Sequence, residues 1–218
     1  METFLPIILG AGLAIAMIVE WSSRPRSRAW RALRQMKSLP IAQIKDGVPA
    51  RITGTVSALG TTMTAPIGKR PCIGFRLEIV RMAGQHASTN VIRREDCGPF
   101  VIADESGKAT IEGAVLLGID WEHDWSELPQ DCYGVLERAG VQTDGLFFRK
   151  RFVFRQALLQ AGDRVSACGL AYFEPDPTAP AVGLREPALR PHLRGTKRAL
   201  IAVGDAGPLR HLVDLIKR

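Results

Sequence analysis

The sequence predicts a mainly β domain, a small and partly open barrel of the OB type with a helical insertion. An N-terminal transmembrane helix precedes it and a short C-terminal helix follows it. Three observations predict this class: an apolar run at residues 4–19, period-two alternation from residue 49 onward, and turn residues between the alternating segments. We divide the 218 residues into an anchor (1–21), a basic juxtamembrane segment (22–45), a β-domain (46–204) and a C-terminal helix (205–218). A β-sandwich is the alternative arrangement of such strands.

The apolar run FLPIILGAGLAIAMIV carries no charge and is closed by Glu20 and Trp21. A spanning helix needs about 20 apolar residues, so the run is just long enough with its flanks; a buried core helix or an interfacial segment is the alternative. A signal peptide would carry its positive charge before the run, whereas here the basic residues follow it: Arg24, Arg26, Arg28, Arg31, Arg34 and Lys37. Positive charge stays on the cytoplasmic side. We therefore expect a single-pass protein of the cell (inner) membrane, with its N-terminus outside and its main domain in the cytoplasm.

The formal net charge of +7 has a local origin. Residues 21–45 hold seven basic side chains and no acid, and the rest of the chain holds 22 of each sign. Anionic lipid explains a basic stretch beside a span better than DNA does, at about 1 kcal/mol per side chain. Ala29, Trp30, Leu33 and Met36 share one helical side, which is typical of an interfacial helix; a solvated helix is the alternative. The lipid bilayer is therefore an expected partner.

Strands are predicted wherever apolar and polar residues alternate, at residues 50–58, 72–79, 148–155 and 164–173. Gly54 marks a bulge or a close approach within the first of them. Residues 100–114 predict a hairpin that turns at Asp104–Gly107, because Asp, Ser and Gly favour turns. Residues 81–97 mix charges without a period and are expected to form a loop. A short strand is expected near residues 198–203, and a helix at 207–217.

The segment 118–145 interrupts the strand pattern. Residues 131–139 predict a short helix that ends at Gly140, because glycine is favoured just past a helix end. Trp121 and Trp125 are expected to pack, with the polar residues around them facing water. Those residues match no metal-binding spacing: Asp120, Glu122, His123, Asp124 and Glu127. We expect no metal ion and no cofactor.

Four cysteines are widely spaced and form no C-x-x-C pair: Cys72, Cys97, Cys132 and Cys168. Zinc is therefore poorly supported, and a cytoplasmic location disfavours disulfides. A reactive Cys72 would need a lowered pKa and a nearby base. The alternative, which we favour, is a structural thiol that fills a small space in a loop shaped by Pro66, Gly68 and Pro71.

Three motifs follow one another within residues 46–173: TGTVSALGTTMTAPIGKRPCIGFRLEI, FVIADESGKATIEG and LLQAGDRVSACGLA. Together they resemble the GIDE/MULAN-type ubiquitin ligases, whose corresponding region is called the beside-a-membrane domain. The family pattern is similar to A-P-x-S-G-R-P-C, then D-E-S-G, then E-x-x-L-x-x-G-D-x-V. The sequence departs from it at Ile67–Gly68–Lys69 and at Gln156, where the family tends to have Glu.

The resemblance implies a membrane-apposed domain that binds other proteins. The binding residues it implies are Ala65, Pro66, Gly68, Arg70, Pro71, Cys72, Asp104, Ser106 and Gly107. The ligases of the family also carry a RING zinc domain, for which this chain has no ligand spacing up to Arg218. We therefore expect a prokaryotic-like member without a RING domain, acting as a non-enzymatic binding or scaffold module.

Two other functions stay open. Basic and aromatic residues alternate at 147–155, as on the strands of OB barrels that bind single-stranded nucleic acid. Alternation places most of these phenylalanines opposite the arginines, in the core, and the body is neutral, so nucleic acid is disfavoured. A ubiquitin-ligase-related component that needs a separate RING partner is the other alternative.

Overall fold

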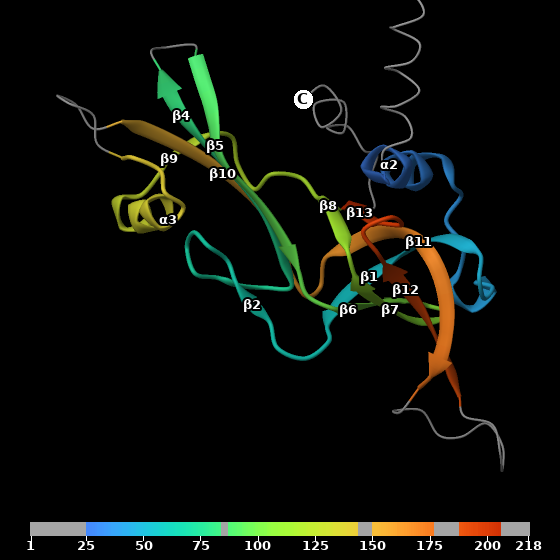
Figure 1. Cartoon of the computed structure of the whole chain (residues 1–218). Helices are drawn as coiled ribbons and strands as arrows, with labels where there is room; N and C mark the ends of the chain where they lie inside the picture. Colours follow the sequence, from blue (N-terminus) through green and yellow to red (C-terminus); the bar gives the residue numbers. More distant parts are fainter. Residues whose placement is uncertain (1–24, 84–86, 144–149, 177–187, 206–218) are drawn as a thin grey trace, which may run out of the picture.

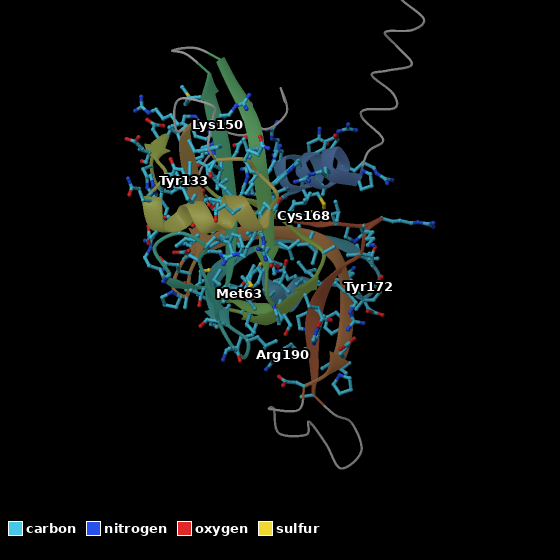
Figure 2. The ribbon with its side chains drawn as sticks, turned by 60° about the vertical axis from the view of Figure 1, so that its left-hand side comes forward. Met63, Tyr133, Lys150, Cys168, Tyr172 and Arg190 are labelled. Atoms are coloured by element: carbon cyan, nitrogen blue, oxygen red, sulfur yellow. The ribbon has the colours of Figure 1, made fainter. Side chains whose placement is uncertain are left out.

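The computed structural model describes residues 25–83, 87–143, 150–176 and 188–205. Within these ranges, side chains are described for all residues except 83 and 87–90. Strands make up 53% of the structure, which confirms the mainly β class. Figure 1 shows a barrel and a longer sheet that extends away from it. Figure 2 gives a second view, in which Tyr172 and Arg190 mark the barrel and Tyr133 and Lys150 mark the longer sheet.

The barrel consists of β1 (Pro49–Ala58), β6 (Phe100–Asp104), β7 (Gly107–Gly113), β11 (Arg164–Pro175) and β12 (Leu189–Gly195). The strands follow the order β1–β6–β7–β12–β11, and β11 pairs again with β1. All of these pairs are antiparallel except β7 with β12. The barrel is therefore closed, whereas the sequence predicted a partly open one.

Alternation fills the interior of the barrel as predicted. Ile52, Ile102, Ile111, Val165 and Leu193 are fully buried in one cluster. Gly54 is the predicted close approach, because a Cβ there would lie 2.2 Å from the carbonyl oxygen of the neighbouring strand. Burial of such aliphatic side chains contributes about 1.5–3 kcal/mol each, so this interior supplies much of the folding energy.

The strand β12 was missed by the sequence analysis. It carries Pro191, and a proline inside a strand argues against assigning a central strand. The neighbouring strand β11 is long and bent in Figure 1: its first half pairs with β1 and with β13 (Ile201–Asp205), and its second half pairs with β12. The strand β13, predicted near residues 198–203, also pairs in parallel with β8 (Val115–Gly118).

The second sheet has the order β5–β4–β10–β9, with β4 at Gly74–Ala83, β5 at Ala87–Cys97, β9 at Ser126–Glu127 and β10 at Arg151–Leu159. The prediction of a loop at residues 81–97 was wrong, because β5 pairs with β4 along its length. Its charged residues hid the strand, yet charge is a common device for protecting a sheet edge. One face of the sheet is apolar, with Leu77, Ile79 and Phe152 in a second core cluster.

The predicted helical insertion covers this apolar face. It consists of η2 (Gln130–Cys132) and α3 (Tyr133–Arg138). Leu136 of α3 is fully buried in the same cluster as Phe152. Gly140 has a φ of 73°, the left-handed conformation that favours glycine after a helix. The prediction of a short helix that ends at this glycine is confirmed.

The helix α2 (Pro25–Gln35) packs on the barrel. Trp30 and Leu33 are buried against Leu116, Cys168 and Ala202. Trp30 lies so close to Gly118 of β8 that a Cβ there would be 2.2 Å from its ring. The prediction of an interfacial helix with Trp30 at the membrane surface was therefore wrong, because its apolar side belongs to the core of the domain.

The predicted membrane anchor lies outside the residues that the structure describes, and so does the predicted C-terminal helix. Within residues 25–205, apart from the gaps given above, no helix is both long and apolar enough to span a bilayer.

Candidate functional site

The first motif forms a hairpin in which β2 (Met63–Thr64) pairs with β3 (Pro71–Cys72). The amide of Ala65 donates to the carbonyl of Arg70 at 2.8 Å. Between them, Gly68 and Lys69 have φ values of 76° and 50°. Glycine adopts such a backbone freely, whereas lysine does so at a cost. The hairpin is therefore a tight and shaped loop, as Pro66, Gly68 and Pro71 predicted.

Gln156 of β10 holds this hairpin in place. Its Nε2 donates to the carbonyl of Ile67, and its Oε1 accepts from the amide of Ile67, both at 3.2 Å. Its side chain is buried. An amide can donate and accept at once, whereas an ionised carboxylate can only accept. This pairing gives a physical reason for glutamine at the position where the resembled family tends to have glutamate.

Cys72 is 2% exposed and packs in the second core cluster. Burial raises the pKa of its thiol, and the negative charge of Glu122 adds to this, although Arg70 opposes it. A nucleophilic cysteine requires the opposite shift. These observations favour the structural role expected for Cys72.

Arg70 reaches from the hairpin to Glu122, with which it forms an ion pair. The amide of Glu122 in turn donates to the carbonyl of Gln156 at 3.0 Å. The hairpin, β10 and the segment 119–125 are thus connected. That segment carries the two tryptophans singled out from the sequence.

The second motif is the turn between β6 and β7. Asp104 accepts hydrogen bonds from the amide and hydroxyl of Ser106 and from the amide of Gly107, at 2.6–3.0 Å. Its other oxygen accepts from the amide of Ile41 at 2.9 Å, and the Ser106 hydroxyl accepts from the amide of Ala42 at 3.1 Å. The turn therefore anchors the short helix η1 (Ile41–Gln43) to the barrel.

Two opposing effects act on the Asp104 carboxyl. Burial raises its pKa, but the hydrogen bonds from Ser106, Ile41 and Gly107 lower it by more, so the pKa lies below its ordinary value. Both oxygens are occupied by groups of the domain itself. The hairpin and the turn thus attach to different sheets and serve the architecture, and the structure does not combine them into one binding surface.

Four side chains form what we call the Trp–Arg stack: Arg76, Trp121, Arg155 and Trp125. The guanidinium carbon of Arg155 lies 4.3 Å from the ring centroid of Trp121 and 4.5 Å from that of Trp125. The guanidinium carbon of Arg76, on β4, lies 4.2 Å from the ring centroid of Trp121. Such distances are within the range of a cation–π interaction. Trp125, at the outer end, is 37% exposed.

The cation in the middle of the stack has a buried counter-ion. Arg155 donates through Nε and Nη2 to Oε2 of Glu78, at 2.9 and 2.6 Å, and the Glu78 side chain is 3% exposed. The two residues are cross-strand partners on β10 and β4. Burial, and then the positive charge of Arg93, lower the pKa of Arg76 to about 10, so it stays charged at neutral pH. The stack is therefore rigidly positioned.

The sequence analysis found only part of this stack. It expected Trp121 and Trp125 to pack, and it placed Arg155 opposite the phenylalanines, where Phe152 and Phe154 are indeed buried. The cross-strand contact of Arg155 with Glu78 joins residues 77 positions apart. Alternation reveals which side chains share a face of a strand, but it does not reveal which distant strand lies beside it.

The polar residues around the two tryptophans have separate partners. The amide of Asp120 donates to Asp205, Glu122 pairs with Arg70, and Glu127 lies 3.6 Å from Arg151. His123 packs edge-on against Phe154. The structure therefore disperses this group rather than gathering it around one point.

The outer face of α2 carries the basic residues of the juxtamembrane segment. Its apolar residues face the barrel, and its exposed basic side chains are Arg26, Arg28, Arg31 and Arg34; Lys37, just past the helix, is exposed as well. Arg26 pairs with Glu95 of β5 at 2.9 Å. Arg24 lies outside the described residues. The basic face is thus presented by a helix that is fixed to the domain.

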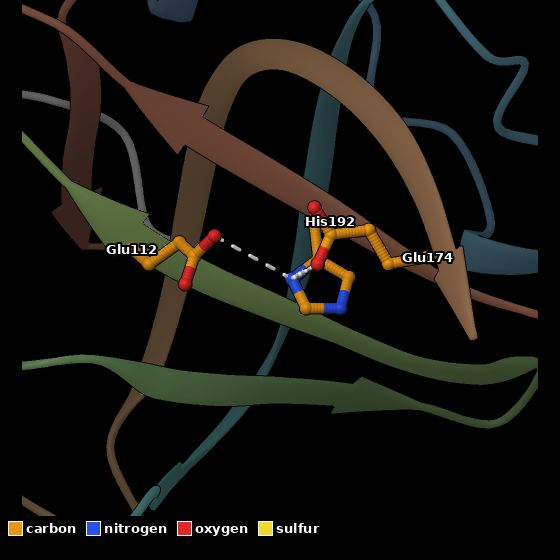
Figure 3. A group of neighbouring side chains, drawn as sticks. All are labelled: Glu112, Glu174 and His192. Carbon is orange, nitrogen blue, oxygen red and sulfur yellow. Dashed lines mark ion pairs between the residues drawn. The ribbon is translucent and has the colours of Figure 1, made fainter. Parts of the chain in front are cut away.

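Three potential metal ligands lie together on the outside of the barrel: Glu112 of β7, Glu174 of β11 and His192 of β12. Their ligand atoms are within 4.8 Å of one another, and Figure 3 shows the histidine between the two carboxylates. The sequence analysis expected no metal and did not single out these residues. They come from three strands, one of which was not predicted.

Comparison with known proteins adds no family. No family model matches the chain, and no curated protein sequence matches it. The resemblance to the GIDE/MULAN type stays a hypothesis, and function has to be inferred from the geometry.

Proposed function

We propose that this chain is a membrane-anchored, non-enzymatic protein-binding module of the GIDE type, and that its Trp–Arg stack is the binding surface. The observation that carries the proposal is Trp125, a large aromatic side chain that is held by Arg155 and still 37% exposed. Tryptophan and arginine dominate the energetics of protein interfaces. Because Arg155 is already held by Glu78, the stack itself would lose little conformational entropy when a partner binds.

The surroundings of the stack fit the anatomy of an interface. A typical interface has an aromatic centre and a polar, solvent-exposed rim. Here two ion pairs lie beside the stack residues. Glu122, which pairs with Arg70, is in the same segment as Trp121 and Trp125, and Arg151, which pairs with Glu127, is on the same strand as Arg155. Both pairs are at least partly exposed and can exchange partners at small cost. A partner that inserts an apolar or aromatic side chain beside Trp125 would fit this arrangement.

The barrel supports the assignment to the OB class. Numbered along the chain, its five strands follow the order 1-2-3-5-4 and close from 4 to 1, with strands 3 and 5 parallel. This is the Greek-key connection of an OB barrel. The second sheet grows out of two connections of this barrel, between β1 and β6 and between β7 and β11. The barrel would then be the scaffold, and the second sheet would carry the binding surface.

Membrane attachment is supported by the apolar run at residues 4–19 and by the exposed basic face of α2. We propose that this face lies toward anionic headgroups on the cytoplasmic side of the cell membrane. Since α2 is packed on the barrel, the contact would orient the whole domain. Single-stranded nucleic acid is the less favoured alternative, because Arg155 is neutralised by Glu78 and Arg151 lies near Glu127.

The test compares two exposed aromatic residues, Trp125 in the stack and Tyr172 on the barrel, which are 37% and 39% exposed. The tagged full chain is isolated from native membranes, and co-purifying proteins are quantified by mass spectrometry. We expect Trp125→Ala to deplete the specific partners by about 30-fold, as for loss of a hot spot of about 2 kcal/mol, and Tyr172→Ala to retain them.

Equal recovery of partners by both variants would remove the stack from the binding surface. Nuclease-sensitive recovery of nucleic acid by the wild type would favour the OB-type nucleic-acid binder. A RING protein among the partners lost with Trp125→Ala would identify the chain as a ligase component. Thermal unfolding of each variant verifies that the domain is folded.

A further inference from the structure

The outer face of the barrel contains a pair of buried polar atoms without partners. Within the described residues, three buried side-chain nitrogen or oxygen atoms lack a hydrogen-bond partner, and two of them are Thr110 Oγ1 and His192 Nδ1. Thr110 is 2% exposed. It is the register partner of His192 across the parallel pair β7–β12. Buried polar groups are almost always satisfied, so two neighbouring exceptions call for an explanation.

His192 Nδ1 is directed at two carboxylates that it does not bind. It lies 3.8 Å from Oε1 of Glu112 and 4.0 Å from Oε2 of Glu174. Dashed lines mark these contacts in Figure 3. Both distances exceed those of a hydrogen bond. Nitrogen and carboxylate ligands lie about 2.0–2.2 Å from a zinc ion. Two ligands of one ion are then about 3.4 Å apart at a tetrahedral angle, so a small inward movement would place all three in contact with a cation.

We infer that Glu112, Glu174 and His192 form a binding site for a divalent transition-metal ion of the zinc class. Calcium and magnesium prefer oxygen ligands, whereas an imidazole nitrogen with two carboxylates suits zinc and its neighbours. Three protein ligands leave a fourth position open for water. The unpartnered hydroxyl of Thr110 belongs to the register partner of His192 on the neighbouring strand.

Arg194 of β12 holds the two carboxylates. Its Nη2 donates to Oε1 of Glu112 at 2.5 Å and to Oε1 of Glu174 at 2.8 Å, and its Nε donates to Glu112 at 2.7 Å. Hydrogen bonds to Glu112, and then its charge and that of Glu174, raise the pKa of Arg194. Together the two carboxylates and Arg194 keep one net negative charge. Hydrogen bonds to ligating carboxylates are the usual outer shell of a metal site.

The experiment is a titration of the purified, metal-free full chain with Co²⁺, followed by its visible d–d absorption, and then displacement by Zn²⁺. We expect one equivalent to bind, without the intense charge-transfer band of a thiolate ligand. His192→Ala and Glu174→Gln should each weaken binding by at least tenfold. His123→Ala, a histidine away from the site, should bind as the wild type does. Arg194→Gln keeps all three ligands and should stay within about tenfold of the wild type.

A second measurement does not depend on the fold of a variant. In the wild type, Zn²⁺ should protect His192 from diethyl pyrocarbonate, as read by peptide mass spectrometry, while His123 stays reactive. The inference is overturned if the wild type does not bind Co²⁺ at 100-fold excess, if His192→Ala binds equally well, or if a thiolate band shows that the cysteines take the metal. Unchanged reactivity of His192 in Zn²⁺ would overturn it as well. It is independent of the proposed function of the Trp–Arg stack.

Discussion

The interior of the barrel and the charged face of the second sheet are both buried, but they are stabilised by different interactions. The barrel interior is aliphatic, with Ile52, Ile102 and Leu193 fully buried. On the second sheet, Glu78 and Arg76 are buried; Glu78 pairs with Arg155, and Arg76 lies over the ring of Trp121. Apolar packing tolerates exchanges that preserve volume, whereas a buried charge depends on a particular partner.

This difference separates stability from recognition. The barrel interior and α2 form a compact apolar unit. The second sheet buries polar groups that each have a particular partner. Gln156 of β10 bonds to Ile67 of the hairpin, and Glu78 of β4 bonds to Arg155 of the stack. We expect changes on the barrel side to unfold the protein and changes on the second sheet to alter its surface first.

The largest effect is expected from removing α2. A chain that begins at Leu39 loses Trp30 and Leu33 from the barrel side, and truncation of such residues costs about 3–5 and 2–5 kcal/mol. The sum approaches the whole stability of an ordinary domain, about 5–15 kcal/mol. We therefore expect this chain to aggregate or to unfold without cooperativity. A chain that begins at Arg24 keeps the helix and should melt cooperatively.

Circular dichroism melts of the two truncated chains make the measurement. The strand alternation begins only at residue 49, so the sequence by itself suggests the opposite, that residues 1–38 can be removed without loss of the fold. Equal melting temperatures for the two chains would restore that view and would show that α2 adds little to the barrel.

An intermediate effect is expected from Glu78→Gln on the second sheet. The change leaves Arg155 without its counter-ion in a site where its side chain is 19% exposed. Loss of a partner from a mostly buried charged hydrogen bond costs about 1–3 kcal/mol. Urea unfolding should show this loss, together with an altered tryptophan fluorescence of Trp121 and Trp125. Glu127→Gln is the matched control, because its pair with Arg151 is exposed, and it should change stability by less than about 0.5 kcal/mol.

Equal losses of unfolding free energy in Glu78→Gln and Glu127→Gln would contradict the importance of the buried ion pair. A double variant, Glu78→Gln with Arg155→Gln, tests whether the pair acts through its charge. If the pair matters through its charge, the double variant should recover part of the loss. No recovery would mean that the two side chains act through packing alone.

The barrel strands could be predicted because one face of each is apolar and the other polar, as at Ile52 and Val165. Three elements were misjudged for identifiable reasons. The charged residues of β5 are typical of a loop, and Pro191 of β12 is typical of a break between strands. The arginines of α2 are typical of a helix at a membrane surface, although Trp30 is buried in the domain. A local pattern shows which side of one element is buried. The outcome for β5, β12 and α2 depends instead on the neighbouring element that packs against each of them.

The candidate site divides in the same way. The hairpin and turn residues were found through the resemblance, and the structure gives them architectural contacts. The Trp–Arg stack was found only in part and the Glu112–Glu174–His192 group not at all, because each combines strands far apart in the chain. Spacing within a sequence carries no information about the register between distant strands.

The smallest effect is expected at Asp104, whose carboxyl anchors η1 to the turn between β6 and β7. The pKa of this carboxyl is lower in the folded protein than its ordinary value of 3.8. The ionised form therefore stabilises the fold at all pH values well above 3.8, and the contribution disappears as the pH falls through the folded pKa. Because the group is only partly buried and water screens its charge, we expect only about 0.5–1 kcal/mol. Asp104→Asn should lower the free energy of unfolding by this amount at pH 7 and by much less at pH 3. Glu105→Gln, at the neighbouring exposed position, should show no such pH dependence. An equal loss for Asp104→Asn at both pH values would mean that the side chain anchors η1 by shape and hydrogen-bond count rather than by its charge.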